Sequence, residues 1–120
     1  KNYQVFEVNP YLRIIEPEIS VIGRKVVAKF KLEQVTSNEV YRISLFAHSH
    51  IDVSNKLNIV NRTEELNRSI TDGEAFELSI NLEDYTSTLV PGKSYYFRIG
   101  AQSHGSETKY NYSASVQLDI

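Results

Sequence analysis

Apolar side chains occupy every second position in four stretches of the chain. These stretches are Val26 to Leu32, Tyr41 to Ala47, Phe76 to Leu82 and Tyr95 to Ala101. A period of two places alternate side chains on the buried face of a β-strand, whereas a helix needs a period of 3.6 residues. No part of the chain keeps the helical period over about ten residues or more. We therefore predict a strand in each stretch.

Turn-forming residues separate these strands. Pro91 fixes its own φ and Gly92 accepts a positive φ, so the pair predicts a tight turn before the strand that contains Tyr95. Asp72 and Gly73 predict a second turn, before the third of the four strands. Two of the four predicted strands are thus each preceded by residues that end regular structure.

The two ends of the chain predict further, shorter strands. Residues 1–8 fit a short edge strand, and residues 11–16 fit a second one that Pro17 ends, because proline lacks a backbone N–H. A hairpin loop is expected at residues 104–107, and the last strand at about residues 112–120.

Residues 49–73 mix apolar and polar side chains without a sustained period. One or two short strands with a turn at Ser54 and Asn55 fit this segment. Residues 63–66 could instead form one helical turn. The sequence leaves these alternatives open.

The strands and turns together predict one all-β domain. The count is about seven strands, with turn signals about every 8–14 residues, which is typical of a two-sheet sandwich with Greek-key connections. No repeat, linker or low-complexity tract divides the chain, so we predict that residues 1–120 form a single domain.

Composition narrows the possible roles. The net charge of −2 gives no field that would attract nucleic acid, so we expect no nucleic-acid partner. The chain has no Cys, which excludes disulfides and thiolate metal sites. It has no Met either, so we expect a fragment of a longer protein. No apolar run approaches the roughly 18–20 residues that cross a bilayer.

Four segments resemble the fibronectin type III and immunoglobulin-like sandwiches. They are Val26-x-Ala28-x-Phe30, Tyr41 to Leu45, Phe76 to Leu82, and Leu89-x-Pro91-Gly92-x-x-Tyr95-x-Phe97-x-Ile99-x-Ala101. In this resemblance they stand for the second, third, fifth and sixth strands, and Phe30 replaces the usual Trp. The resemblance implies that Tyr95 is a tyrosine-corner residue, with its hydroxyl bonded back to the backbone of the turn.

A narrower resemblance concerns the C-terminal immunoglobulin-like domain of uncharacterised Bacteroidetes surface lipoproteins. It is carried by Arg42 to Phe46, Asp52 to Asn55, Tyr96 to Ala101, and Tyr110 to Ser113. This resemblance implies a role beside outer-membrane glycan-uptake systems. It also implies that the parent protein is secreted or lipid-anchored at the cell surface. The lipid anchor would lie outside this chain, and the protein would contact the membrane only through that anchor.

His48, His50 and Asp52 form a His-x-His-x-Asp motif. On a strand, residues two apart share a face, so both imidazoles could reach one divalent metal, as in a small metal-dependent hydrolase. Such enzymes need further ligands from other loops, and His104 is the only other histidine. We therefore expect two exposed histidines at the end of a strand, with no metal and no cofactor.

Three tyrosines, Tyr85, Tyr110 and Tyr112, lie in or beside loops that join the late strands. Exposed aromatic rings on such loops can stack on sugars or pack against a protein, although they can also close the ends of a sandwich. We predict these three as ligand-binding residues. No catalytic nucleophile motif, phosphate-binding glycine loop or basic stripe accompanies them.

These observations predict a non-catalytic, monomeric domain at the cell surface that contacts a glycan or a protein, or acts as a spacer, in glycan uptake. The metal-dependent hydrolase built on His48, His50 and Asp52 is one alternative. A glycosylated eukaryotic receptor-type ectodomain is another, because Asn61, Asn67 and Asn111 each begin an N-x-Ser/Thr sequon.

Overall fold

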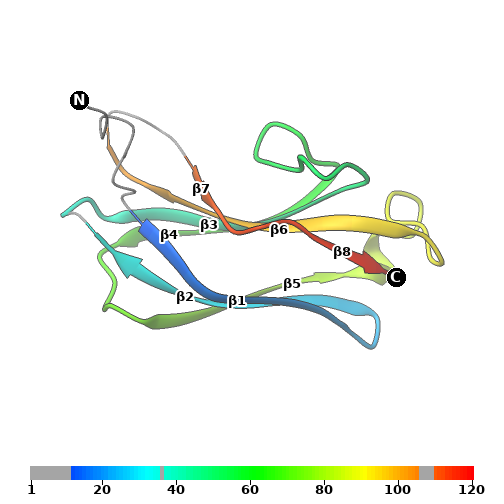
Figure 1. Ribbon diagram of the computed structural model, residues 1–120, viewed down its shortest axis with the longest axis horizontal. Coiled ribbons are helices and arrows are strands. Elements are labelled where there is room, and N and C mark those ends of the chain that lie inside the picture. The colour runs from blue at the N-terminus through cyan, green and yellow to red at the C-terminus, as the bar shows by residue number, and fades with distance from the viewer. Residues whose placement is uncertain (1–11, 36, 106–109) are drawn as a thin grey trace, which may run out of the picture.

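The computed structural model describes residues 12–35, 37–105 and 110–120. Eight strands in this part of the chain form two sheets that face each other (Figure 1). They are β1 (Leu12–Ile22), β2 (Lys25–Gln34), β3 (Val40–His48), β4 (Val60–Arg68), β5 (Glu74–Asn81), β6 (Ser94–Ser103), β7 (Tyr110–Tyr112) and β8 (Val116–Asp119). A short 3-10 helix, η2 (Leu82–Tyr85), follows β5. Within these residues no helix is long and apolar enough to cross a membrane.

The pairing of the strands is antiparallel throughout both sheets. One sheet has the order β1-β2-β5 and the other the order β4-β3-β6-β7, with β8 also paired to β6. β8 lies along the first half of β6 and β7 along its second half, so the strand predicted at the end of the chain is divided in two. This arrangement confirms the predicted immunoglobulin-like two-sheet sandwich.

The core lies between the two sheets and contains the side chains that alternate along the predicted strands. The buried residues on these inward faces are Val26, Ala28, Phe30, Leu32, Ile43, Leu45, Leu78, Ile80, Phe97, Ile99 and Ala101. Phe30 stacks on Phe76 with their ring centroids 6.0 Å apart. The four strands predicted from alternation are thus all confirmed.

Tyr95 holds the turn that precedes β6. Its hydroxyl accepts a hydrogen bond of 2.9 Å from the backbone N–H of Val90, which is the contact expected of a tyrosine corner. Gly92 has a φ of +89°, a conformation that glycine adopts without strain, and its N–H donates to the carbonyl of Ile120. The turn at Pro91 and Gly92 therefore also holds the C-terminal end of the described chain.

The variant Tyr95→Phe removes this hydroxyl and leaves the ring in the core. We expect the free energy of unfolding to fall by about 1 kcal/mol, because the N–H of Val90 loses its partner in a partly buried place. Urea unfolding of both proteins measures the difference. An unchanged midpoint would show that water replaces the hydroxyl and that the turn needs no such bond.

β1 continues through Pro17, so the prediction that Pro17 ends a strand was wrong. The register against β2 shifts between Ile15 and Glu18, and Glu16 has a positive φ of 53°. β1 is an edge strand, and a bulge in an edge strand can place a proline where no ladder hydrogen bond is lost. The edge strand predicted at residues 1–8 and part of the hairpin loop at 104–107 lie outside the described residues.

Residues 60–68 form the strand β4, so the alternative of a helical turn at residues 63–66 was wrong. β4 pairs with β3 along most of its length. Its side chains are mainly polar and exposed because it is the edge of its sheet, so backbone pairing rather than apolar alternation decides its conformation. Residues 49–59 form a loop, in which Ser54 and Leu57 exchange backbone hydrogen bonds of 2.9 and 3.2 Å.

Arg68 and Glu74 join the end of β4 to the start of β5. Their guanidinium and carboxylate groups form two hydrogen bonds, of 2.6 and 3.2 Å, and the backbone N–H of Thr71 donates to the same carboxylate. The bond from Arg68, helped by that from Thr71, lowers the pKa of Glu74 below its ordinary value. The same pair raises the pKa of Arg68.

This ion pair predicts a small acid-dependent loss of stability. Because the pKa of Glu74 is lower in the folded state, its contribution is fully present above the unfolded pKa of about 4.3 and disappears as the pH falls through the folded value. Urea unfolding between about pH 6 and pH 2.5 measures this dependence. The variant Glu74→Gln is expected to lose stability less steeply in this range, and identical profiles would contradict the assignment.

Candidate functional site

Two tyrosines of β7 form an aromatic cluster on the outer side of the five-stranded sheet. The rings of Tyr110 and Tyr112 stack with centroids 5.7 Å apart and an interplanar angle of 18°. Phe46 of β3 lies against both, at 5.6 and 6.2 Å. Phe46 is buried, Tyr110 is half-buried, and Tyr112 is 36% exposed. The cluster thus has a buried base and a solvent-accessible side.

Two arginines extend this cluster with positive charge. The guanidinium carbon of Arg98 lies 5.0 Å from the ring centroid of Tyr112, and that of Arg42 lies 5.9 Å from that of Tyr110. Arg42 also lies over the ring of Tyr41, at 4.6 Å. We call the surface made by Arg42, Arg98, Tyr110 and Tyr112 the tyrosine face.

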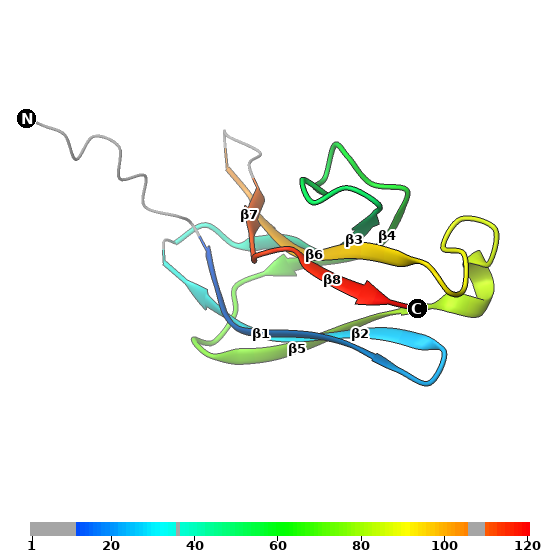
Figure 2. The ribbon, with the colours of Figure 1, turned by 45° about the vertical axis from the view of Figure 1, so that its right-hand side comes forward.

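The loop of residues 49–59 borders the tyrosine face. It rises above the five-stranded sheet in two views (Figures 1 and 2). The hydroxyl of Tyr112 accepts a hydrogen bond of 3.0 Å from the backbone N–H of Asn55, and Arg98 donates to the carbonyl of Val53 at 3.2 Å. Arg98 also donates to the carbonyl of Ser113 at 2.7 Å. The loop, β6 and the segment after β7 are therefore held together by side chains of the tyrosine face.

Gly100 of β6 makes room for these rings. A Cβ atom at this position would lie 2.8 Å from Phe46, 3.0 Å from Tyr110 and 3.3 Å from Tyr112. The first two distances leave no space for a methyl group unless a ring moves. Gly100 pairs with Tyr112 across β6 and β7, so the missing side chain lies directly under the cluster.

Tyr85 does not join the other two tyrosines. It ends η2, which lies between β5 and β6 at the right-hand end of the sandwich in Figure 1, whereas β7 lies toward the opposite end. Its ring is 36% exposed beside a groove of about 240 Å³. The structure therefore separates the three tyrosines into two places, and their role in binding stays a prediction.

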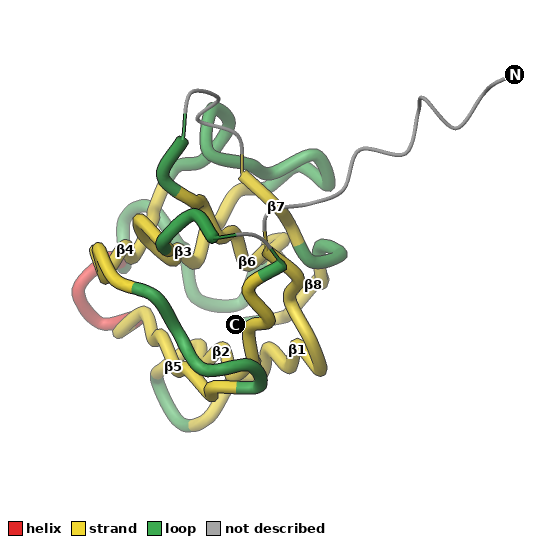
Figure 3. Tube along the Cα trace, turned by 90° about the vertical axis from the view of Figure 1, so that its left-hand side faces the viewer, coloured by secondary structure: helices red, strands yellow, loops and turns green. Residues whose placement is uncertain are grey.

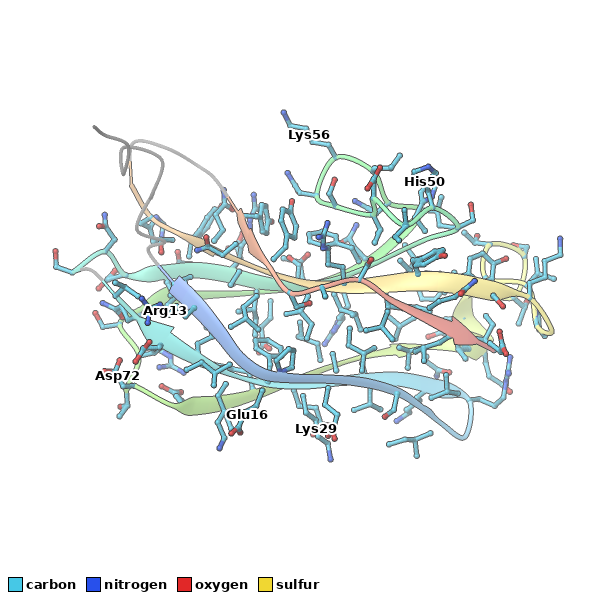
Figure 4. The ribbon with its side chains drawn as sticks, in the orientation of Figure 1. Arg13, Glu16, Lys29, His50, Lys56 and Asp72 are labelled. Carbon is cyan, nitrogen blue, oxygen red and sulfur yellow. The ribbon has the colours of Figure 1, made fainter. Side chains whose placement is uncertain are left out.

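A larger depression, of about 460 Å³, lies on the outside of the three-stranded sheet. Its charged residues include Glu16, Lys29 and Lys31, and Figure 4 shows Glu16 and Lys29 pointing away from the other sheet. Lys31 and Glu16 form an ion pair of 3.1 Å. Lys29 stands between Glu18 and Glu77 on the neighbouring strands, so this surface has the character of an ordinary charged sheet face.

His48, His50 and Asp52 do not assemble a metal site. β3 ends at His48, and the chain turns at the next residues, so His50 is not on the same strand face. The Nδ1 atoms of His48 and His50 accept hydrogen bonds from the backbone N–H groups of His50 and Asp52, at 3.0 and 3.1 Å. In the part of the chain that the structure describes, no group of three or more His, Cys, Asp or Glu residues is placed to hold a metal ion.

The three sequons lie on or beside strands. Asn61 is on β4 and Asn111 is on β7, and Asn67 is near the end of β4 with a positive φ of 51°. The Oδ1 atom of Asn67 is 2.6 Å from Nε2 of His104. The side chain of Asn67 is thus used to connect β4 to the end of β6.

The model of the protein family DUF3823_C, a domain of unknown function, matches residues 12–117. The chain belongs to the DUF3823_C family. This match confirms the resemblance to the C-terminal immunoglobulin-like domain of Bacteroidetes proteins. A search of the curated proteins found no match.

This DUF3823_C domain is similar to several solved structures of bacterial proteins. A "putative carbohydrate binding protein" from Bacteroides uniformis is 28% identical with a TM-score of 0.86, over 92% of this chain and 58% of its own. A DUF3823 family protein from Parabacteroides merdae is 22% identical with a TM-score of 0.76, over 92% of this chain and 53% of its own. The chain thus spans a little over half the length of these relatives. OgpA from Akkermansia muciniphila shares 13% identity with a TM-score of 0.61, over 95% of this chain and 28% of its own, which shows a common fold alone.

The sequence did not reveal several residues that shape the DUF3823_C tyrosine face. Arg42 and Arg98 stand at outward positions of ordinary strands, where charged side chains are common. Gly100 does not belong to the set of alternating apolar residues in β6, so nothing in the sequence singled it out. One signal was present: Phe46 is a large apolar residue at an outward position of β3, which indicates that something covers that face.

Proposed function

We propose that this domain is a non-catalytic glycan-interaction module of a bacterial cell-surface protein that takes part in glycan uptake. The similarity to the Bacteroides uniformis protein, which is described as carbohydrate-binding, supports this role. The proposal includes a parent protein that continues beyond this chain, since the relatives are longer, and a lipid anchor outside it.

The tyrosine face is the observation that carries the proposal. An aromatic ring can pack against the C–H groups of a sugar, and guanidinium N–H groups can donate hydrogen bonds to its hydroxyls. Tyr112 presents part of its ring to solvent, and Arg98 is fixed by two backbone carbonyls. Rings and donors that are already held in place cost little ordering entropy when a ligand binds.

The chemistry of this surface suits binding rather than bond cleavage. Hydrolysis of a glycosidic bond generally uses two carboxyl groups on opposite sides of that bond. Within the described residues, the side chains of the tyrosine face contact one another, Tyr41, Phe46, the side-chain amide of Gln102 and backbone groups, and none of these contacts is to a carboxylate. We therefore expect the domain to hold a glycan without changing it.

A glycan array tests the proposal. The wild-type domain is expected to bind one or more polysaccharides, and Tyr112→Leu and Tyr110→Leu are expected to weaken that binding about tenfold, because leucine fills space but offers no aromatic face. Ile22→Ala is a matched control, since Ile22 is an exposed apolar side chain on β1, outside the tyrosine face, and it should bind as the wild type does.

Circular dichroism must show that each variant is folded. A folded wild-type domain that binds no glycan would contradict the proposal. It would favour the protein-contact or spacer role, for which Ile51, Leu57 and Ile59 provide exposed apolar side chains on the loop of residues 49–59.

A further inference from the structure

The groove beside Tyr85 lies where the open edges of the two sheets meet. Figure 3 shows η2 as the short red segment at the side of the sandwich where β4 and β5 run, away from β7 and β8. Six of the residues that line the groove are Lys25, Arg62, Ser79, Asn81, Asp84 and Tyr85. They come from β2, β4, β5 and η2, so both sheets contribute to one binding surface.

The charged groups of this groove are available to a ligand. Lys25, Arg62 and Asp84 form no hydrogen bond or ion pair with any side chain in the described ranges. Their neighbours behave differently, since Arg24 and Glu83 pair with each other at 3.8 Å. Two cations and one carboxylate therefore line the groove without a direct ion pair between them.

The platform under these charges is held in place. Leu82 of η2 is fully buried, and the side chain of Asn81 accepts a hydrogen bond of 3.1 Å from the backbone N–H of Glu83. The carbonyl of Tyr85 accepts hydrogen bonds from the N–H groups of Thr88 and Leu89, at 2.9 and 2.7 Å. The backbone that carries the exposed Tyr85 side chain is thus held in place before any ligand arrives.

We propose that this groove binds a sugar residue that carries a carboxylate, such as a uronic acid. The inference rests on the proposed function, because it takes the ligand to be a glycan, and it adds a second site and a chemical class. The sugar ring packs on Tyr85, its carboxylate lies between Lys25 and Arg62, and Asp84 accepts hydrogen bonds from its hydroxyls. A volume of about 240 Å³ is below the range of drug-sized pockets and suits a single sugar residue.

The positive charges decide between an acidic and a neutral sugar. Asp84 would suit either, since a carboxylate accepts hydroxyl hydrogen bonds from any hexose. Two cations that face one carboxylate leave an excess positive charge in the groove, although the whole chain carries a net charge of −2. Discrimination by exposed charges is modest and depends on salt.

Nuclear magnetic resonance titration of the ¹⁵N-labelled domain tests this inference with two matched pairs of probes, glucuronate against glucose and galacturonate against galactose. Within a pair the probes differ in the carboxylate, so the comparison isolates its effect. We expect shift changes at residues 79–85, and an affinity for at least one acid about fivefold higher than for its neutral partner at low salt.

The variants Arg62→Gln and Lys25→Gln are each expected to reduce this preference while the domain still folds, because both side chains are exposed. Arg13→Gln is the matched control, since Arg13 is also an exposed arginine but lies outside the groove, where it contacts Glu33 at 3.4 Å. It should leave the preference intact.

Equal affinities within both pairs, a lack of binding by both acids, or shift changes that map only to the tyrosine face would overturn the inference. In each case the glycan array would still decide the proposed function separately. A domain that binds neutral polysaccharides through Tyr112 but shows no acid preference at the groove would refute only the second site.

Discussion

Replacement of Phe97 by alanine is expected to lower the free energy of unfolding by about 3–5 kcal/mol, the largest effect of any change considered for this domain. Phe97 is fully buried on β6, between the two sheets. It pairs with Ala47 of β3 on one side and with Val116 of β8 on the other. Its loss would leave a cavity at the centre of the core that neighbouring side chains fill only in part. Urea unfolding followed by circular dichroism measures the change.

Phe97→Leu is the appropriate comparison, because leucine retains more of the apolar volume and should cost less than Phe97→Ala. Ile22→Ala serves again as an exposed control and should change stability by no more than about 0.5 kcal/mol. A loss of less than about 1 kcal/mol in Phe97→Ala would contradict the placement of Phe97 in the core.

Gly100→Ala is expected to have the second-largest effect, and to act on both stability and binding. The added methyl group would lie within 2.8 Å of Phe46 and 3.0 Å of Tyr110, and Phe46 is buried and has little freedom to move. Overpacking of this kind costs about 1–3 kcal/mol. Because the rings must shift, the tyrosine face should also bind its glycan more weakly. Urea unfolding and titration with the glycan found on the array measure the two effects.

A double-mutant cycle identifies the cause of this effect. Phe46→Leu removes the ring that the new methyl group would meet, so Gly100→Ala should cost less in the Phe46→Leu background than in the wild type. Additive changes in the free energy of unfolding would show that the strand backbone, rather than the rings, opposes the substitution.

The strands with alternating side chains could be predicted because burial of one face imposes a period of two on the sequence. The segments from Val26 to Leu32 and from Tyr95 to Ala101 illustrate this, since each has one face in the core. The turn at Pro91 and Gly92 was also readable, because its conformation demands those residue types.

β4 was predicted only as one of the alternatives for residues 49–73, and the bulge in β1 was not predicted. β4 is stabilised by its backbone pairing with β3. Because its side chains are mainly polar and exposed, they do not show the alternation of apolar residues that would have predicted the strand. The strand β1 continues past Pro17 because an edge strand tolerates a residue without a backbone N–H. Which strands lie at the edges of a sheet could not be predicted from the sequence.

The candidate site was predictable only as a set of residue types. Tyr110 and Tyr112 are two apart, so a shared face on a strand could be expected, and their stacking follows from it. The two tyrosines also have Arg98, Arg42 and Phe46 beside them. This arrangement depends on which strands lie next to β7, and the order of the strands is a property of the whole fold. The separation of Tyr85 from the other two tyrosines has the same origin.

The most direct test of the account incubates the 120-residue domain with a polysaccharide that it binds on the array, and measures binding and cleavage in the same sample. Isothermal titration reports the affinity, and a reducing-sugar assay reports any broken glycosidic bonds. The account predicts saturable binding that Tyr112→Leu weakens, with no reducing ends released. Release of reducing ends, or binding that is unaffected by Tyr112→Leu and Tyr110→Leu alike, would contradict it.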